Sequence, residues 1–308
     1  MKKASGVEIA EYAGRRVDSP RGLQMLDRAG ATLGCPFSGG ACSKLSRSNG
    51  QHPVCSLRVN GDLYPVCTDR IIPAKSERQS QDHLVVLGQL AEALFPGVDP
   101  KSIAFKRQVS LSPKNRDSAG EGKTRATKLF LDYLLTVNPP VVQAGRTMAF
   151  VEIQGGGETS NTGTITKFLD SLVGNPDAAT LIQSLPAGAN PIPNNAYKRQ
   201  LPQLIEKAVL AKSCNGGAAL VMGTYLYDYV LQRVPLRGQW YPDWEVSLVE
   251  VTEDPKLIGD NFGLRVNRSA FGSMADLLSA WTSPPTITNP MVGKWQRLNG
   301  MEFELPDD

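Results

Sequence analysis

The chain has 308 residues, of which 41% are hydrophobic, and its formal net charge is +3 at pH 7. This composition is typical of a globular protein with the core of one large or two ordinary domains. No apolar run approaches the ~20 residues that cross a bilayer, and the first 25 residues contain no apolar signal core. We therefore expect no membrane partner and a cytoplasmic location.

The charge is divided unevenly along the chain. Residues 1–131 contain 20 Lys and Arg against 12 Asp and Glu, whereas the remaining residues contain 13 against 18. A basic first portion suits a polyanion such as DNA, because each cation that neutralises a phosphate releases condensed counterions. Ordinary variation over a solvated surface gives similar counts, and the counts alone slightly favour that interpretation.

The first half of the chain falls into two parts by composition. Residues 1–80 are rich in Gly, Ser, Cys and Pro and hold only short apolar pieces, so we expect a small N-terminal region followed by a larger domain at 81–308. Apolar spacing predicts a helix over 82–96 that ends before Pro96. Residues 102–122 turn polar and basic, which predicts a mobile loop or arm.

The remaining elements alternate between strands and helices. Strands are predicted over 128–137 and 147–154, with prolines and a glycine forming a turn between them, and again over 244–251 and 262–270. Helices are predicted over 164–174, 200–213, 216–234 and 273–283. This order indicates an α/β fold with a central sheet flanked by helices.

Four of the five cysteines lie close together in the sequence. Cys35, Cys42, Cys55 and Cys67 are separated by 6, 12 and 11 residues. A reducing cytosol disfavours disulfides, and four thiolates suit a tetrahedral structural metal, iron or zinc, that would supply folding energy to a segment with little core. His52 could replace one thiol as a ligand, although four thiols suffice. Four unrelated core cysteines are the other interpretation, which their density disfavours.

Polar side chains interrupt two of the predicted strands. Glu152 and Gln154 lie two residues apart and therefore on one face, and Asp132 interrupts the preceding strand 20 residues earlier. Two acids on neighbouring strands are a plausible site for a hard divalent cation such as Mg²⁺, which phosphodiester cleavage requires. An Asp followed by Glu-x-Lys is typical of many nucleases, and Gln154 stands at the lysine position. A salt-bridged Asp132 and a strand-edge Glu152 are an equally good interpretation of this pattern alone.

Several motifs together resemble the NotI-type restriction endonucleases, which are bacterial type II enzymes. The motifs are "IAEYAGRRV", "CPFSGGAC", "LYPVCTDRI", "LFLDYLL", "FVEIQ" and "LRVNRSAFGSMADLL", and they recur along most of the chain. The resemblance implies a PD-(D/E)xK nuclease-like core with a small N-terminal metal-binding subdomain and a restriction-modification role in a bacterial cytoplasm. It also implies that Asp132, Glu152 and Gln154 form the catalytic triad, with Gln154 orienting the attacking water, and that the four cysteines hold iron.

A restriction enzyme must grip its DNA and read the bases. Cations that crowd the approach to the Asp132 strand, together with two at the start of a predicted helix, are candidate phosphate contacts: Lys106, Arg107, Lys114, Arg116, Lys123, Arg125, Lys128, Lys198 and Arg199. Most of these are expected to be ordinary surface residues. The resemblance implies double-stranded DNA with a GC-rich palindrome as the target, which a two-fold homodimer reads best.

Two other classes of function compete with a site-specific nuclease. A metal-stabilised, sequence-specific DNA-binding protein would carry the same cysteines and cations, with Asp132 and Glu152 in structural roles only. A metabolic enzyme is disfavoured, because the three glycines at 155–157 lack the spacing of a phosphate-binding loop and neither histidine lies near a nucleophile motif. The remaining cysteine, Cys214, is expected to be a buried, inert thiol.

Overall fold

A computed structural model of the chain describes most of the residues that matter for these predictions. The described residues are 7–19, 21–22, 34–40, 42, 53–73, 80–111, 129–138, 145–156, 162–182, 199–236, 238–282, 293–296 and 302–305. Every structural statement below refers to them.

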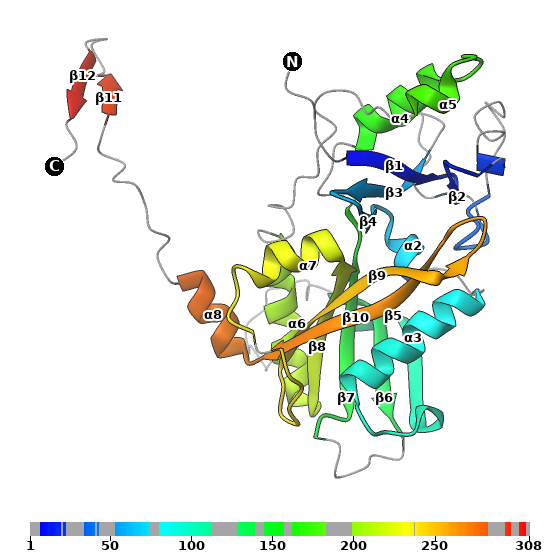
Figure 1. The fold of residues 1–308 in the computed structure, drawn as a ribbon. Coiled ribbons are helices and arrows are strands. Elements are labelled where there is room, and N and C mark those ends of the chain that lie inside the picture. The colour runs from blue at the N-terminus through cyan, green and yellow to red at the C-terminus, as the bar shows by residue number, and fades with distance from the viewer. Residues whose placement is uncertain are drawn as a thin grey trace, which may run out of the picture.

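The centre of the molecule is a six-stranded mixed sheet (Figure 1). In spatial order the strands are β10 (Phe262–Gly272), β9 (Val246–Ile258), β8 (Gly216–Gly223), β7 (Met148–Gln154), β6 (Leu129–Val137) and β5 (Ile103–Leu111). The three central strands β7, β8 and β9 run parallel, whereas β5, β6 and β10 are added antiparallel. The mixed α/β class and four of these strands, β6, β7, β9 and β10, were expected from the sequence and are confirmed.

The central strand β8 corrects one prediction. Residues 216–234 were expected to form a single helix, but residues 216–223 form β8 and only Thr224–Leu231 form a helix, α7. Every residue of β8 is buried, because it has parallel neighbours on both sides and is covered on both faces. Such a strand is apolar throughout and lacks the alternation that marks a half-exposed strand.

The edge strand β5 corrects a second prediction. Residues 103–111 lie in the segment expected to be a loop, but they pair with β6 from Ile103 opposite Val137 to Leu111 opposite Leu129. Because β5 is at the edge of the sheet, all nine of its residues are exposed or half-buried. Its polar composition therefore suits an edge strand as well as it suits a loop. Residues 112–122 lie outside the described residues.

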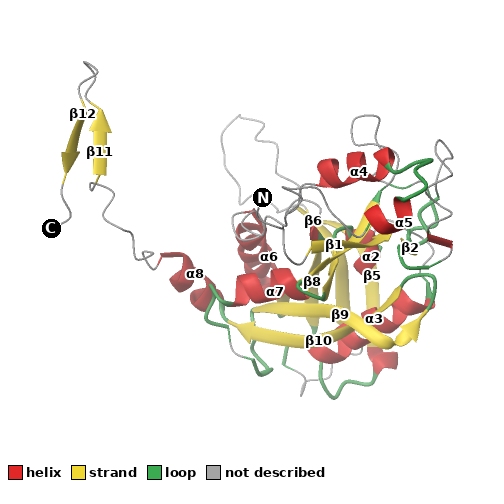
Figure 2. Cartoon of the chain, turned by 45° about the horizontal axis from the view of Figure 1, so that its top comes forward, coloured by secondary structure: helices red, strands yellow, loops and turns green. Residues whose placement is uncertain are grey.

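Helices cover both faces of the large sheet (Figure 2). Helix α3 (Gln81–Leu94) packs on the face that includes Tyr133, Val151 and Val249. The opposite face carries residues of α6 (Leu201–Ser213), α7 and α8 (Met274–Thr282), whereas α4 (Thr162–Ser171) packs against the N-terminal strand β3 (Val54–Val59). The helices predicted at 82–96, 164–174, 200–213 and 273–283 are thus confirmed within a few residues.

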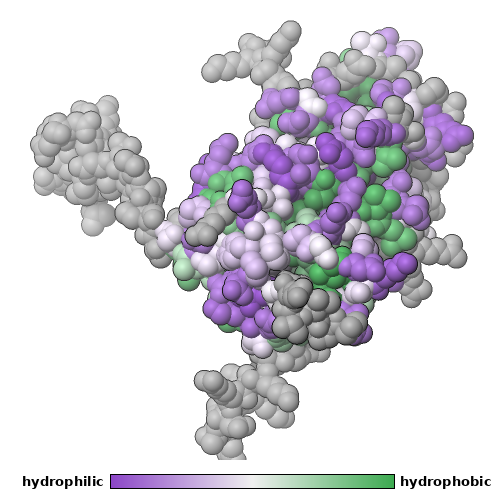
Figure 3. Space-filling view, turned by 60° about the horizontal axis from the view of Figure 1, so that its bottom comes forward, coloured by the Kyte–Doolittle hydropathy of each residue, from purple (hydrophilic) through white to green (hydrophobic). Residues whose placement is uncertain are grey.

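Several short elements lie outside the large sheet and its covering helices. They are the 3-10 turn η1 (Pro100–Ser102), the helix α5 (Ala178–Leu181), and a separate hairpin of β11 (Gly293–Gln296) and β12 (Glu302–Leu305). Among the described helices, none is long and apolar enough to span a membrane. The face seen in Figure 3 mixes hydrophilic side chains with scattered apolar patches.

The N-terminal residues form a second, smaller sheet beside the large one (Figure 1). It is antiparallel, with the order β2 (Arg15–Arg16), β1 (Val7–Tyr12), β3 (Val54–Val59) and β4 (Asp62–Pro65), and a short helix α2 (Thr68–Ile71) follows. Ile9 and Leu57 of the small sheet belong to the same apolar cluster as Phe150 and Leu220 of the large one. The two sheets therefore share a core, and the division at residue 80 stays a prediction.

A buried ion pair fixes the small sheet against the large one. Arg70 on α2 donates from Nε to Oε2 of Glu11 on β1 at 2.6 Å, and from Nη2 to Oε1 at 2.9 Å. Ser56 Oγ and the backbone N–H of Phe262 donate to the same carboxylate at 2.6 and 2.7 Å. Since Phe262 begins β10, this network ties β1, β3 and α2 to the edge of the large sheet.

Candidate active site

The fold brings Asp132 and Glu152 together where β6 and β7 separate. The last paired residues of these antiparallel strands are Tyr133 and Val151, so Asp132 and Glu152 are the next residue on each strand. The Oδ2 atom of Asp132 accepts a hydrogen bond from the backbone N–H of Ile153 at 2.8 Å. The Asp132 side chain therefore takes the place of the next ladder bond, and its charge lies beside Glu152.

Glu152 is a largely buried acid in a charged setting. Its side chain is 17% exposed. Burial, and secondarily the charge of Asp132, raise the pKa of Glu152 to about 7, while Lys207 acts in the opposite direction. A carboxyl group with these neighbours differs from an ordinary surface acid and is typical of functional sites.

Lys207 is a site residue that sequence reasoning missed. It lies on α6, the helix that directly precedes β8 in the chain, and its ammonium group forms an ion pair with Glu152 Oε1. Lys207 is buried along with Leu204, Ala208 and Ala211. These positions recur at the spacing of one helix face, so a lysine within an apolar stripe was the available signal.

Gln154 lies at the C-terminal end of β7 and is buried. Its Nε2 atom donates to the carbonyl of Gly155 at 2.5 Å, so this end of the amide is turned towards the backbone. Side chains alternate along a strand, which places Gln154 on the same side of β7 as Glu152. The structure thus puts all three members of the predicted triad at one end of β6 and β7.

The glycines after Gln154 are explained by close packing. A Cβ atom on Gly155 would lie 2.6 Å from the carbonyl oxygen of Val66, and one on Gly156 would lie 2.3 Å from the ring of Tyr64. Neither distance is compatible with a side chain at these positions. The end of β7 therefore rests directly against the segment that carries Cys67.

The four N-terminal cysteines are grouped near the start of β3, and only Cys55 belongs to a strand of the small sheet. Cys35 and Cys55 pack together with Phe37, and Cys42 packs against them. The backbone N–H of Cys67 donates to the carbonyl of Cys55 at 3.2 Å. Burial, and secondarily the negative charge of a neighbouring Cys67 thiolate, raise the pKa of the Cys55 thiol well above its usual value. Among the described residues, none of these four cysteines forms a disulfide.

The cysteine region has some features of a metal site and lacks others. Backbone N–H groups of Gly14 and Ser38 donate to the sulfurs of Cys55 and Cys35 at 3.2 and 3.4 Å, which would favour thiolates. Within the described ranges, however, no three His, Cys, Asp or Glu side chains are close enough to hold one ion. The iron or zinc site stays a prediction, and His52 lies outside the described residues.

The predicted phosphate contacts are only partly described. Lys106 is exposed and Arg107 is half-buried on β5, the strand next to Asp132, and Arg199 is exposed just before α6. Gln108, between Arg107 and Val109 on β5, has a left-handed φ of 46°. The other candidates lie outside the described residues: Lys114, Arg116, Lys123, Arg125, Lys128 and Lys198.

One prediction about the cysteines is wrong. Cys214 was expected to be buried, but it is exposed because it follows the last turn of α6.

A second polar network lies on the same sheet, away from the two acids. Glu250 on β9 is buried and accepts from Arg268 Nε at 2.5 Å and from Asn267 at 2.9 Å. The Arg268 guanidinium lies 4.8 Å from the centre of the Tyr227 ring and also pairs with Asp228. Tyr227, Asn267 and Arg268 are among the residues that line a pocket of about 480 Å³. Because two acids already neutralise Arg268, the network is adequately explained by the packing of β9, β10 and α7.

Comparison with known proteins leaves the geometry as the main guide. No protein-family model matches this chain, and no curated protein is significantly similar to it. Two of the motifs that carry the resemblance contact each other in the structure. Glu11 of "IAEYAGRRV" forms an ion pair with Arg70 of "LYPVCTDRI".

Proposed function

We propose that this protein is a NotI-type, magnesium-dependent restriction endonuclease that cuts both strands of DNA at a specific, GC-rich palindrome. The observation that carries the proposal is the placement of Asp132 beside Glu152 at the point where β6 and β7 separate. A mixed sheet flanked by helices, with acids on neighbouring strands, is the arrangement that a PD-(D/E)xK nuclease-like core requires.

The donor atoms of this pair fit a hard cation. Carboxylate oxygens are the ligands that Mg²⁺ prefers, and the two acids would hold it from adjacent strands. When bound, Mg²⁺ supplies polarisation of the phosphoryl oxygen and activation of a water. The protein contributes a fixed frame, because the Ile153 N–H orients Asp132 and Lys207 orients Glu152. Gln154, on the same side of β7, is proposed to orient the attacking water.

The other parts of the proposal concern stability and the partner. Cys35, Cys42, Cys55 and Cys67 would bind a structural iron or zinc ion, which suits four cysteines that form no disulfide among the described residues and are grouped beside the small sheet. Double-stranded DNA would run across the acids, with Lys106 and Arg107 of β5 beside it. A homodimer would present two such sites to the two strands of a palindrome.

Incubation with DNA of known sequence tests the catalytic claim. In Mg²⁺ the wild-type protein should give discrete fragments, and Asp132→Asn or Glu152→Gln should reduce cleavage by about 10³-fold or more while DNA binding persists. Glu92→Gln, which alters an exposed acid on α3, should cut like wild type. Binding without cleavage by the wild-type protein would favour the alternative, a metal-stabilised DNA-binding protein.

Metal analysis of the purified protein under reducing conditions tests the cysteine site. About one iron or zinc ion per chain is expected, and it should be lost in Cys55→Ala. Protein that folds and binds DNA without either metal would contradict this part alone.

A further inference from the structure

Lys207 is the charged residue of this site whose presence the fold does not explain. Its side chain is 6% exposed, and burying an ammonium group carries a large desolvation penalty. Apolar residues of matching volume in place of such a pair are often neutral or stabilising. An apolar residue at 207 would also extend the stripe formed by Leu204, Ala208 and Ala211. Packing therefore gives no reason for a lysine here.

The charges around Glu152 give that reason. The carboxyl groups of Asp132 and Glu152 lie next to each other on neighbouring strands, where two negative charges repel. The Glu-x-Gln sequence places no cation on β7, and the Gln154 amide is neutral and donates to Gly155. Lys207 brings a positive charge to the pair from another element and contacts a single oxygen of Glu152, Oε1.

We propose that Lys207 is a positioning residue for the proposed nuclease reaction and supplies from α6 the cation that Gln154 cannot supply from β7. It offsets the repulsion between the two acids and fixes the orientation of the Glu152 carboxylate. The inference rests on the proposed function, because it concerns the same site.

The position of Lys207 on a packed helix suits this role. Helix α6 leads directly into the central strand β8, and Leu204, Ala208 and Ala211 anchor it in the core on either side of Lys207. A side chain carried by a helix packed in this way is held more precisely than one on a loop. A second lysine of α6, Lys212, pairs with Glu245 near the far end of the helix and is half exposed, so it provides a matched control.

The test compares three variants with wild type in single-turnover cleavage, in DNA binding without divalent metal, and in thermal unfolding. Lys207→Met keeps the length of the side chain and should lower the cleavage rate roughly 100-fold while DNA affinity stays within about threefold. Lys207→Arg keeps the charge and should recover the rate to within about tenfold of wild type. Lys212→Met should cleave like wild type.

Each other outcome counts against the proposal. If Lys207→Met cleaves like Lys212→Met, the inference is overturned although the nuclease assignment stands. If cleavage, DNA affinity and the unfolding temperature fall together and Lys207→Arg restores none of them, the residue is structural and the inference is again overturned. If wild type itself does not cleave, the proposed function fails first and the inference fails with it.

Discussion

The buried pair of Glu11 and Arg70 gives the sharpest prediction about stability. In Arg70→Met the Glu11 carboxylate, which is fully buried, keeps the donors Ser56 and Phe262 but loses its countercharge. Removing one partner of a buried pair typically costs about 3–5 kcal/mol, and the two remaining donors place this case near the lower value. We therefore expect the free energy of unfolding to fall by about 3 kcal/mol.

Chemical denaturation followed by circular dichroism measures this change. The double variant Glu11→Gln, Arg70→Met removes the unpaired charge and should be more stable than Arg70→Met alone by about 1–2 kcal/mol. As a control, Asp18→Ala breaks the more exposed pair with Arg16 and should cost about 1 kcal/mol or less. If Arg70→Met costs no more than Asp18→Ala, the network does not hold the two sheets together as argued.

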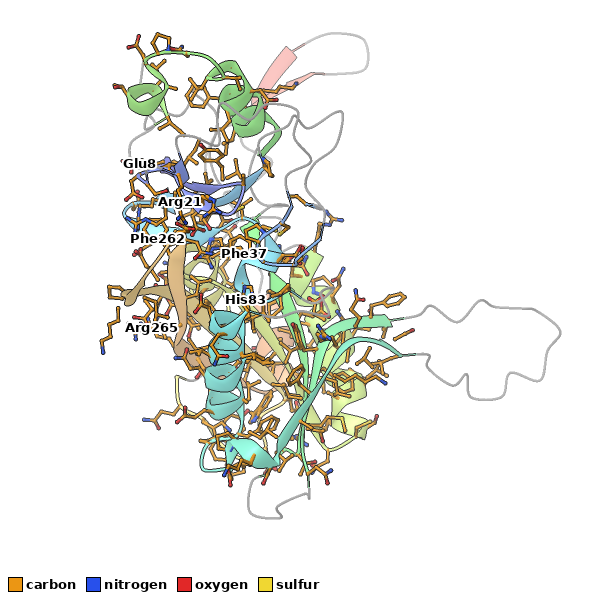
Figure 4. All side chains as sticks on the ribbon, turned by 90° about the vertical axis from the view of Figure 1, so that its right-hand side faces the viewer. Glu8, Arg21, Phe37, His83, Phe262 and Arg265 are labelled. Atoms are coloured by element: carbon orange, nitrogen blue, oxygen red, sulfur yellow. The ribbon has the colours of Figure 1, made fainter. Side chains whose placement is uncertain are left out.

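Three further predictions concern other parts of the chain. Burial, and secondarily the charge of Arg70, lower the pKa of His83 from its ordinary 6.5 to about 4. His83 lies on α3, and its ring packs edge-on against Phe37 (Figure 4). As pH falls, the His83 ring is therefore protonated in the unfolded chain before it is protonated in the folded one. The free energy of unfolding should fall by up to about 3 kcal/mol between pH 6.5 and pH 4. Denaturation of His83→Leu should not show this dependence on pH. Gly155→Ala should lower the unfolding temperature, because its Cβ meets backbone atoms, whereas Gly88→Ala in open space on α3 should raise it slightly. In the Lys207→Met background, Gln154→Lys should recover cleavage at least about tenfold if the cation is what the site lacks, and a folded double variant without recovery would argue against that account.

The sequence was sufficient to predict an element where one of its faces is buried and the other is exposed to solvent. Helix α3, with its apolar spacing and its end just before Pro96, could be placed within about two residues. It was insufficient at β8, whose burial on both faces removes the alternation. It was also insufficient at β5, where an edge position permits a polar sequence. In both strands the missing information is the identity of the neighbours, which lie far away in the chain.

The candidate site shows the same limit. The juxtaposition of Asp132 and Glu152 could be anticipated, because strands joined by a turn pair with each other. The contact between Lys207 and Glu152 could not, because it depends on how α6 crosses the sheet. The glycines after Gln154 had no local explanation either, since their cause is the approach of residues 64–68 from the small sheet.

The close packing of residues 64–68 against Gly155 and Gly156 also limits how the chain can be divided into fragments. The end of the strand that bears Glu152 packs against N-terminal residues, and no side chain lies between Gly155 and the backbone around Cys67. Deleting residues 1–80 would expose Gly155 and Gly156 to water and would remove the N-terminal members of the shared apolar cluster, such as Ile9, Leu57 and Tyr64. Residues 81–308 would therefore not keep this structure without residues 1–80. A substitution on one side of this contact would require a compensating substitution on the other side.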